Sequence, residues 1–122
     1  TLFPYTTLFR SRTFLKHLDD SIKDRCIAAK LISPAHENVF HVFPFLTRKR
    51  DQLKAFLAEN GVGTKIHYFR PPYLQPCYPE MNHLEFPVAK RIADEELSLP
   101  CNSSLNDEDI IRVSKLINQF LV

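Results

Sequence analysis

The spacing of apolar residues predicts an amphipathic helix near the amino-terminal end of the chain. From position 14 to position 29, apolar side chains recur at steps of three and four residues, with charged residues between them. This period places the apolar side chains on one face of a helix. They are Phe14, Leu15, Leu18, Ile22, Cys26 and Ala29. We expect the helix to end before Pro34, in a short polar connection with the sequence SPAHEN.

Three later segments have the composition of β-strands. They are residues 38–46 (NVFHVFPFL), 64–69 (TKIHYF) and 97–100 (LSLP). β-Branched and aromatic residues dominate the first two segments. Pro44 has no backbone N–H to donate, so the first strand should lie at a sheet edge or carry an irregularity there. In the second strand, Ile66 and Tyr68 should point to one face and their neighbours to the other.

Helical patterns separate these strands. Leu53, Phe56 and Leu57 form the apolar stripe of a helix that follows Thr47, a residue able to cap its first turn. Gly61 should end this helix, because glycine tolerates the left-handed conformation of a carboxy-terminal cap. The result is a tight exit from this helix into the second strand.

Two further helices are predicted before and after the third strand. Pro87 stands at the first position of the segment PVAKRIADEEL, where a proline suits a helix start. Asn106 can cap the last helix, whose acidic first turn suits the positive end of the helix dipole. The two apolar stripes are Val88, Ala89, Ile92 and Ala93, and Ile110, Val113, Leu116, Ile117 and Phe120.

The segment between the second strand and the Pro87 helix is rich in proline. Residues 70–79 have the sequence RPPYLQPCYP, and their prolines exclude a sheet or a long helix. We expect an extended, stiff loop. The order of helix, strand, helix, strand, loop, helix, short strand and helix predicts an α+β fold, with a small antiparallel sheet covered on one side by helices.

The first eleven residues stand apart from this pattern. Residues 1–11 (TLFPYTTLFRS) show no helical or alternating period that the next residues continue, and they lack the features of a secretory signal. They match the translation of one strand of a widely used sequencing-library adapter. We therefore interpret residues 1–11 as a non-native, adapter-derived segment and residues 12–122 as the protein's own domain. A natural aromatic-rich tail is the alternative.

Composition and charge argue against a nucleic-acid partner. The chain has 122 residues, of which 44% are hydrophobic and 25% charged, as in one globular domain. Without Arg10, the 16 basic residues become 15 against 14 acidic ones, a net charge of +1. Such a balance does not attract phosphate backbones. The basic run Arg48-Lys49-Arg50 precedes Asp51, and we interpret it as a solvated first helical turn rather than a phosphate site.

The cysteine, histidine and hydropathy patterns argue against a disulfide-stabilised, metal-binding or membrane protein. Cys26, Cys77 and Cys101 are odd in number and far apart, which favours a reducing compartment over a disulfide framework. The five histidines do not combine with them at the spacing of a closed zinc site, so we expect no metal. No apolar run approaches the roughly 20 residues that span a bilayer. We expect a cytoplasmic protein without a membrane segment.

Five motifs occur together in a recognisable order. They are the strand HVF, the helix RDQL, the run GVGTKIHY, the Pro-rich turn PPYLQPCY and the strand LSLP. From about residue 12 to the end, the sequence resembles the carboxy-terminal region of the DegT/DnrJ/EryC1/StrS sugar aminotransferases. The chain departs from that pattern at residues 29–34, where these relatives run longer.

The resemblance implies a fold-type-I pyridoxal 5'-phosphate enzyme. Members of that family are expected to act as homodimers that move an amino group from glutamate to a keto carbon of a nucleotide-linked sugar. The resemblance places residues 12–122 in the carboxy-terminal small domain. The Schiff-base lysine and the phosphate cup then lie in a large domain that this sequence does not contain. We therefore expect no catalytic or cofactor-binding residue here, and the fragment alone should be inactive and bind no cofactor.

The resemblance also points to substrate-binding residues around the second strand and the Pro-rich loop. They are His67, Tyr68, Arg70, Tyr73 and Gln75. Groups that hold the remote diphosphate help to orient the sugar, and a stiff loop loses little entropy on binding. Each residue also has a structural interpretation: His67 could bond within the domain, Tyr68 could be core and Arg70 could be solvated. Many relatives have His at the position of Tyr73 and a Pro or a small residue at that of Arg70.

A different class of function remains open on the residues alone. The chain could be a stand-alone module that binds a small ligand or a peptide, and RPPYLQP is similar to a polyproline ligand of SH3-like domains. Residues 70–76 lie between two predicted packed elements and are bordered by aromatic residues. That position favours a folded turn over a free ligand motif.

Overall fold

A computed structural model of the chain describes residues 3–27 and 40–122, with side chains from residue 10 onward within these ranges. Its helices are α1 (Phe3–His17), α2 (Asp20–Lys23), α4 (Arg50–Glu59), α5 (Pro87–Glu95) and α6 (Asp107–Leu121). Over the same ranges, the strands are β1 (Phe43–Leu46) and β2 (Glu96–Leu99), and the 3-10 turns are η1 (Pro72–Leu74) and η2 (Pro79–Met81). The strands pair antiparallel, which confirms the predicted α+β fold with a small antiparallel sheet.

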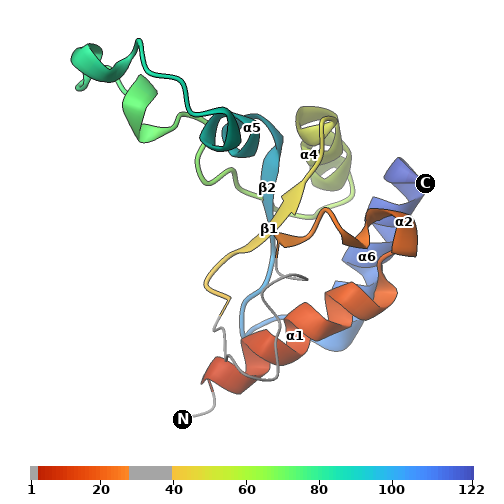
Figure 1. Cartoon of the computed structure of the whole chain (residues 1–122). Helices are drawn as coiled ribbons and strands as arrows, with labels where there is room; N and C mark the ends of the chain where they lie inside the picture. The colour runs from red at the N-terminus through yellow and green to blue at the C-terminus, as the bar shows by residue number, and fades with distance from the viewer. Residues whose placement is uncertain (1–2, 28–39) are drawn as a thin grey trace.

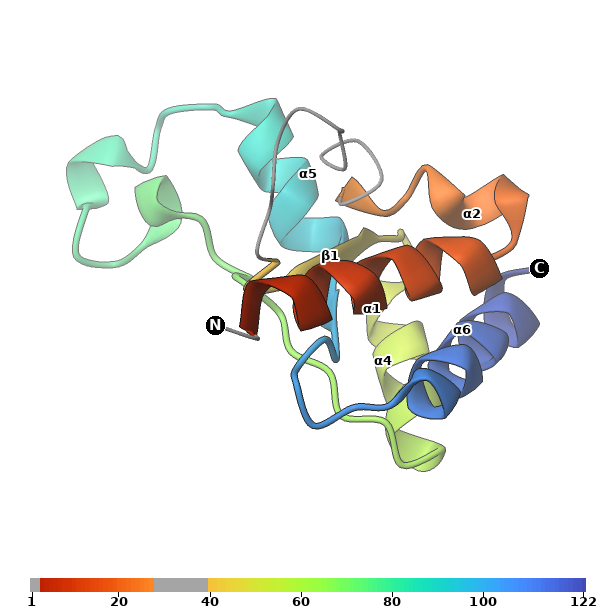
Figure 2. The same ribbon diagram turned by 90° about the horizontal axis from the view of Figure 1, so that it is seen from below.

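The hydrophobic core lies against one face of this sheet. The register sets Phe43 opposite Leu99 and Phe45 opposite Leu97, so these four buried side chains share that face. Helices α1 and α6 lie side by side beneath it, and α4 packs beside α6 (Figures 1 and 2). They and α2 complete the core with Phe14, Leu18, Ile22, Leu53, Leu57, Ile110, Val113 and Ile117.

The sheet is buried more completely than the sequence predicted. All four residues of β2 are buried, so both faces of this strand are covered. The expectation named helices on one side only, and the second face of β2 is covered by a segment that is not a helix. On its second face, the side chains of Glu96 and Ser98 meet His67 from the segment that follows α4. Helix α5 contacts the neighbouring strand β1.

The predicted helix over residues 14–29 is divided between α1 and α2. Its apolar members still enter the core, but the chain leaves the helix at Asp19, whose carboxylate accepts a hydrogen bond from Ser21 N at 2.9 Å. Asn118 of α6 holds the break, because it donates to His17 O at 3.0 Å and accepts from Asp19 N at 2.9 Å. One continuous helix was the wrong prediction, since these contacts satisfy backbone groups exposed at the break. Position 29 and the SPAHEN connection lie outside the described residues.

Helix α1 includes residues 3–11, for which the sequence predicted no helical period. A helix can form there without such a period, because a helix once nucleated extends at little cost and distant contacts hold residues 10 and 11. Arg10 donates from Nε to Leu105 O at 2.7 Å and from Nη2 to Ser103 O at 3.0 Å, and Ser11 is buried. The adapter-derived origin of this segment, and the boundary at residue 12, stay predictions.

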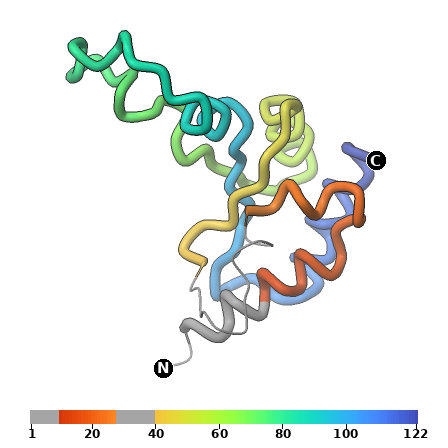
Figure 3. The backbone as a smooth tube through the Cα atoms, viewed as in Figure 1, coloured from red at the N-terminus to blue at the C-terminus, as the bar shows by residue number. Residues whose placement is uncertain are grey.

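The predicted second strand, residues 64–69, is reduced to one bridge. Lys65 N donates to Ser98 O at 3.2 Å, and Ser98 N donates to Lys65 O at 2.7 Å. Beyond it the chain turns outward, so Tyr68 and Phe69 are 73% and 66% exposed. The strand prediction is wrong because these residues leave the edge of β2 after a single pairing. Figure 3 shows residues 70–86 extending away from the rest of the chain.

Helix-capping and helix-start residues predicted the ends of several helices correctly. Gly61 has a φ of +74° just after α4, and α5 begins at Pro87. Asn106 and Asp109 form a capping box at the start of α6, with N–H to oxygen distances of 2.8 and 3.0 Å. Two details differ from expectation. The Pro-rich loop contains the turns η1 and η2 rather than a fully extended chain, and Val88 on α5 is 72% exposed.

The three cysteines should differ sharply in reactivity. Burial raises the pKa of the Cys26 thiol to about 12 and raises that of Cys101, whereas Cys77 is exposed. Because the thiolate is the attacking species, an aromatic disulfide reagent at pH 8 should modify Cys77 first and Cys26 only after unfolding. Mass spectrometry of tryptic peptides over time would check this order. Modification of Cys26 as fast as Cys77 in the folded chain would contradict the core position of Cys26.

Candidate functional site

The outward turn after His67 faces α5 across a cavity of about 400 Å³. We call it the α5 cavity and define it by Tyr68, Arg70, Gln75, Ala89 and Ile92. Its polar groups come from the segment that runs from the bridge at residue 65 to just beyond η1, and its apolar wall comes from α5. The structure therefore brings three of the five sequence-predicted site residues to one concave surface. An apolar wall with a few convergent polar groups is typical of small-molecule sites.

The polar side of the α5 cavity is held in shape by local contacts. Gln75 Nε2 donates to Arg70 O at 3.0 Å, which closes the turn around Pro71 and Pro72. The Arg70 guanidinium carbon lies 5.6 Å from the centre of the Phe69 ring, in the range of a cation–π contact. Arg70 thus presents a positive charge on a proline-stiffened turn. A diphosphate or carboxylate is the kind of group that such a charge can bind.

Tyr73 does not line the α5 cavity. It is buried, and its ring packs edge-on against Phe86 with 5.0 Å between ring centres. This contact joins η1 to the segment just before α5 and holds the projecting loop in a folded shape. The position predicted to contact substrate is therefore occupied by a packing residue in this structure.

His67 lies beside a second cavity, of about 390 Å³, next to Lys65 and Ser98. His67 Nδ1 is 2.8 Å from Ser98 Oγ, and Ser98 Oγ donates to Glu96 Oε1 at 2.5 Å. The second carboxylate oxygen, Oε2, accepts from His67 N at 2.6 Å. Glu96 therefore holds both the backbone and, through Ser98, the side chain of His67.

This network assigns a tautomer to His67. A carboxylate has no hydrogen to donate, so the hydroxyl hydrogen of Ser98 is committed to Glu96. Ser98 Oγ must then accept from His67 Nδ1–H, and a neutral imidazole keeps an acceptor lone pair on Nε2. The assignment follows from the hydrogen-bond network. In this tautomer, His67 can accept a hydrogen bond at Nε2.

Sequence reasoning missed Glu96 altogether. Glu96 is 1% exposed, which is rare for a carboxylate unless its oxygens are paired. The segment EELSLP places it between an acidic helix end and an apolar strand, and the pattern assigned it to the helix. The usable signal is its spacing from Ser98, because residues two apart in a strand point to the same face.

The described residues do not fit the imine-forming role of a pyridoxal phosphate enzyme. Such a lysine needs a desolvated setting, and each described lysine is exposed or only partly buried. No three His, Cys, Asp or Glu side chains in residues 10–27 and 40–122 gather as a metal site. In the same part of the chain, no helix is long and apolar enough to cross a membrane.

Comparisons with known proteins give a consistent picture. The chain is 29% identical to dTDP-3-amino-3,6-dideoxy-alpha-D-galactopyranose transaminase of Aneurinibacillus thermoaerophilus, over 91% of this chain and 31% of the relative. It is 34% identical to the erythromycin biosynthesis sensory transduction protein EryC1 of Saccharopolyspora erythraea, over 81% of this chain and 28% of that protein. The chain therefore spans about a third of the length of these relatives.

A solved structure supports the same fold. The crystal structure of S. venezuelae DesV in complex with a ketimine intermediate superposes with a TM-score of 0.81 at 23% identity, covering 97% of this chain and 32% of DesV. A family match extends over residues 6–118, which includes part of the segment predicted to be adapter-derived. That match covers nearly the whole described fold, and the chain therefore belongs to the DegT/DnrJ/EryC1/StrS aminotransferase family.

Proposed function

We propose that residues 12–122 are the carboxy-terminal small domain of a pyridoxal phosphate-dependent aminotransferase. The parent protein transfers an amino group from glutamate to a nucleotide-linked keto sugar, works as a homodimer and is cytoplasmic. The sugar aminotransferases of this family depend on pyridoxal phosphate, and a relative is named as a transaminase of a dTDP-linked amino sugar. In this proposal the chain supplies substrate recognition, and alone it neither binds the cofactor nor catalyses transfer.

One observation carries this proposal beyond family membership. Tyr68, Arg70 and Gln75 line one cavity, while no lysine in the described part of the chain is buried. This arrangement supports a role in substrate recognition and lends no support to imine chemistry at the described lysines. The cofactor supplies the electron sink when it is bound, and the protein must hold the substrate in register with it. In this proposal, this chain recognises the substrate, and the rest of the parent protein carries out the imine chemistry.

The chain's own residues suggest how recognition works. Arg70 binds the diphosphate, because its planar fork of N–H donors matches phosphate oxygens. Gln75 and the Tyr68 hydroxyl bond to polar atoms nearby, and the wall of α5 excludes water from one side. His67 accepts a hydrogen bond from a sugar hydroxyl at Nε2, with its orientation set by Ser98. Binding a part of the substrate remote from the reaction orients the reacting carbon.

The proposal predicts a substrate-specific defect for Arg70→Gln in the parent enzyme. Loss of a charge-assisted hydrogen bond to phosphate should raise KM for the nucleotide sugar by about tenfold. KM for glutamate should stay unchanged, because Arg70 does not contact the amino donor in this proposal. Steady-state kinetics with each substrate varied in turn would measure both values.

Arg12→Gln is the matched control for Arg70→Gln. Arg12 is exposed on α1 and lies outside the α5 cavity, so this variant removes the same charge without touching the cavity. It should leave both KM values unchanged. An Arg70→Gln enzyme with the wild-type KM for the nucleotide sugar would refute the role of the α5 cavity in diphosphate binding.

A further inference from the structure

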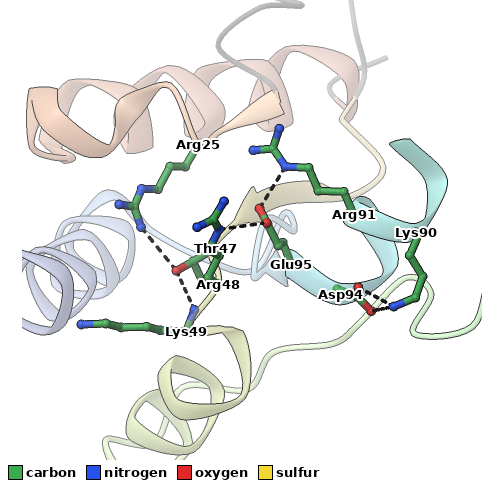
Figure 4. Close-up of polar contacts among 8 residues, drawn as sticks. All are labelled: Arg25, Thr47, Arg48, Lys49, Lys90, Arg91, Asp94 and Glu95. Carbon is green, nitrogen blue, oxygen red and sulfur yellow. Dashed lines mark hydrogen bonds and ion pairs between the residues drawn. The ribbon is translucent and has the colours of Figure 1, made fainter. Parts of the chain in front are cut away.

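A third cavity, of about 680 Å³, lies at the carboxyl end of β1. Its walls carry four cationic side chains from three separate segments: Arg25 follows α2, Arg48 and Lys49 precede α4, and Arg91 lies on α5. We call it the Arg25 pocket and define it by these four residues and Thr47. Figure 4 shows the Arg25 side chain reaching down to Thr47, the Lys49 side chain running away from Thr47 below it, and Arg48 and Arg91 on either side of Glu95.

The contacts inside the Arg25 pocket leave its donors only weakly engaged. Arg25 Nη1 donates to Thr47 Oγ1 at 3.4 Å, and the backbone N–H of Lys49 donates to the same oxygen at 3.2 Å. Because Thr47 Oγ1 accepts both bonds, its own O–H is left as a further donor. Arg48 lies 3.7 Å from the Glu95 carboxylate, beyond hydrogen-bond range. The Arg25 and Arg48 side chains therefore make long contacts within this pocket.

The charges of the Arg25 pocket do not balance. Its four cations face two carboxylates, those of Asp24 and Glu95, which leaves a surplus of two positive charges. Glu95 is shared between Arg48 and Arg91, at 3.7 and 3.3 Å. The Arg48 and Arg91 side chains are 94% and 68% exposed, so water screens part of the repulsion among the cations, and a bound anion would reduce it further. Lys90 does not contribute to this surplus, since it pairs with Asp94 elsewhere on α5.

The backbone adds to the same potential. Helix α4 begins at Arg50, so the positive end of its dipole lies next to Lys49. Arginine forks and helix amino termini both suit tetrahedral oxyanions, and a phosphate dianion matches the surplus of two charges. The sequence favoured a solvated interpretation of residues 48–50, but it did not show that Arg25 and Arg91 join them.

We propose that the Arg25 pocket binds the phosphate group of a small ligand. This site is separate from the α5 cavity, because Arg91 and Glu95 lie on the opposite face of α5 from Ala89 and Ala93. The proposal does not depend on the proposed aminotransferase function. The phosphate can belong to a free anion or to a phosphorylated molecule, and the choice of probe distinguishes the two.

Isothermal titration calorimetry with inorganic phosphate tests the proposal on the 122-residue chain. The wild-type chain should show saturable binding of one phosphate. The double variant Arg25→Gln/Lys49→Gln should lower the association constant by about a hundredfold, since each of the two lost charge-assisted bonds is worth about one power of ten. The control Lys16→Gln/Lys115→Gln removes the same net charge from exposed positions outside the pocket and should bind as the wild type does.

A second measurement guards against misfolded variants. In an amide NMR spectrum of the wild-type chain, phosphate should shift the signals of Thr47 and Lys49 and leave those of Gly61 in place. Repeating the titration with dTDP distinguishes the ligand class: tighter binding than phosphate indicates a phosphorylated molecule, and equal binding indicates a free anion. Absence of saturable binding in the wild type, or equal weakening in both double variants, would overturn the proposal.

Discussion

Replacing Phe43 by alanine should lower the free energy of unfolding by about 3–5 kcal/mol, the range for a fully buried phenylalanine. Phe43 has no exposed surface, stacks on Phe14 with 4.9 Å between ring centres and lies opposite Leu99 in the sheet. Its removal therefore opens a cavity where α1 meets both strands. Urea unfolding followed by circular dichroism would measure the loss as a lower midpoint at unchanged slope.

Two further variants keep this prediction testable. Val88→Ala removes a side chain that is 72% exposed, so its effect should stay within about 0.5 kcal/mol. If Phe43→Ala does not fold, Phe43→Leu serves in its place. It keeps most of the buried volume, so it should fold and lose less of the free energy of unfolding than the roughly 3–5 kcal/mol expected for alanine. A Phe43→Leu chain with unchanged stability would show that Phe43 does not carry the core contacts described above.

Replacing Glu96 by alanine should affect both stability and the state of His67. Two donors, His67 N and Ser98 Oγ, lose their acceptor, and the one left unpaired, the part-buried His67 N, costs about 1–3 kcal/mol. Without Glu96, the Ser98 hydroxyl is free to donate to His67 Nδ1, which should shift the imidazole toward the Nε2–H tautomer. Nitrogen-15 chemical shifts of the imidazole ring report the tautomer directly.

The tautomer is the decisive readout for Glu96, because a merely structural role would change stability alone. Glu59→Ala is the matched control, since Glu59 is exposed at the end of α4. It should change neither stability nor the imidazole shifts. An unchanged His67 tautomer in a folded Glu96→Ala chain would contradict the positioning role that we assign to Glu96.

The elements that the sequence predicted well are those with local causes. The cap at Asn106 pairs with a residue three positions away, the stop at Gly61 depends on one backbone angle, and the start at Pro87 depends on one ring. Each rule acts within a single turn, so the pattern of neighbouring residues contains it. The family motifs added the order of these elements and the choice of candidate site residues.

The features that the sequence missed depend on contacts between distant residues. The break at Asp19 requires Asn118, which is 99 positions away. The tautomer of His67 requires Ser98 and Glu96, which are 31 and 29 positions away. Strand period alone cannot show that the chain leaves β2 after one bridge. For the same reason, a basic run at residues 48–50 gave no indication that cations from elsewhere would join it.

Two exposed aromatic side chains near the α5 cavity agree with the proposal that this chain is part of a larger enzyme. Tyr68 and Phe69 are mostly exposed here and lie at the start of the projecting loop. Exposed aromatic side chains at such a position are typical of surfaces that contact another part of a protein. The proposal assigns that contact to the parent, in which the α5 cavity would face the cofactor domain.

One measurement tests the central claim most directly: amino transfer from glutamate to a nucleotide-linked keto sugar, assayed with this chain and with the reading frame extended upstream in the source DNA. We predict that only the extended protein, carrying a cofactor-binding domain with its lysine, forms the amino sugar. Turnover by the 122-residue chain on its own, or a start codon close to Arg12 with no such domain ahead of it, would contradict the account.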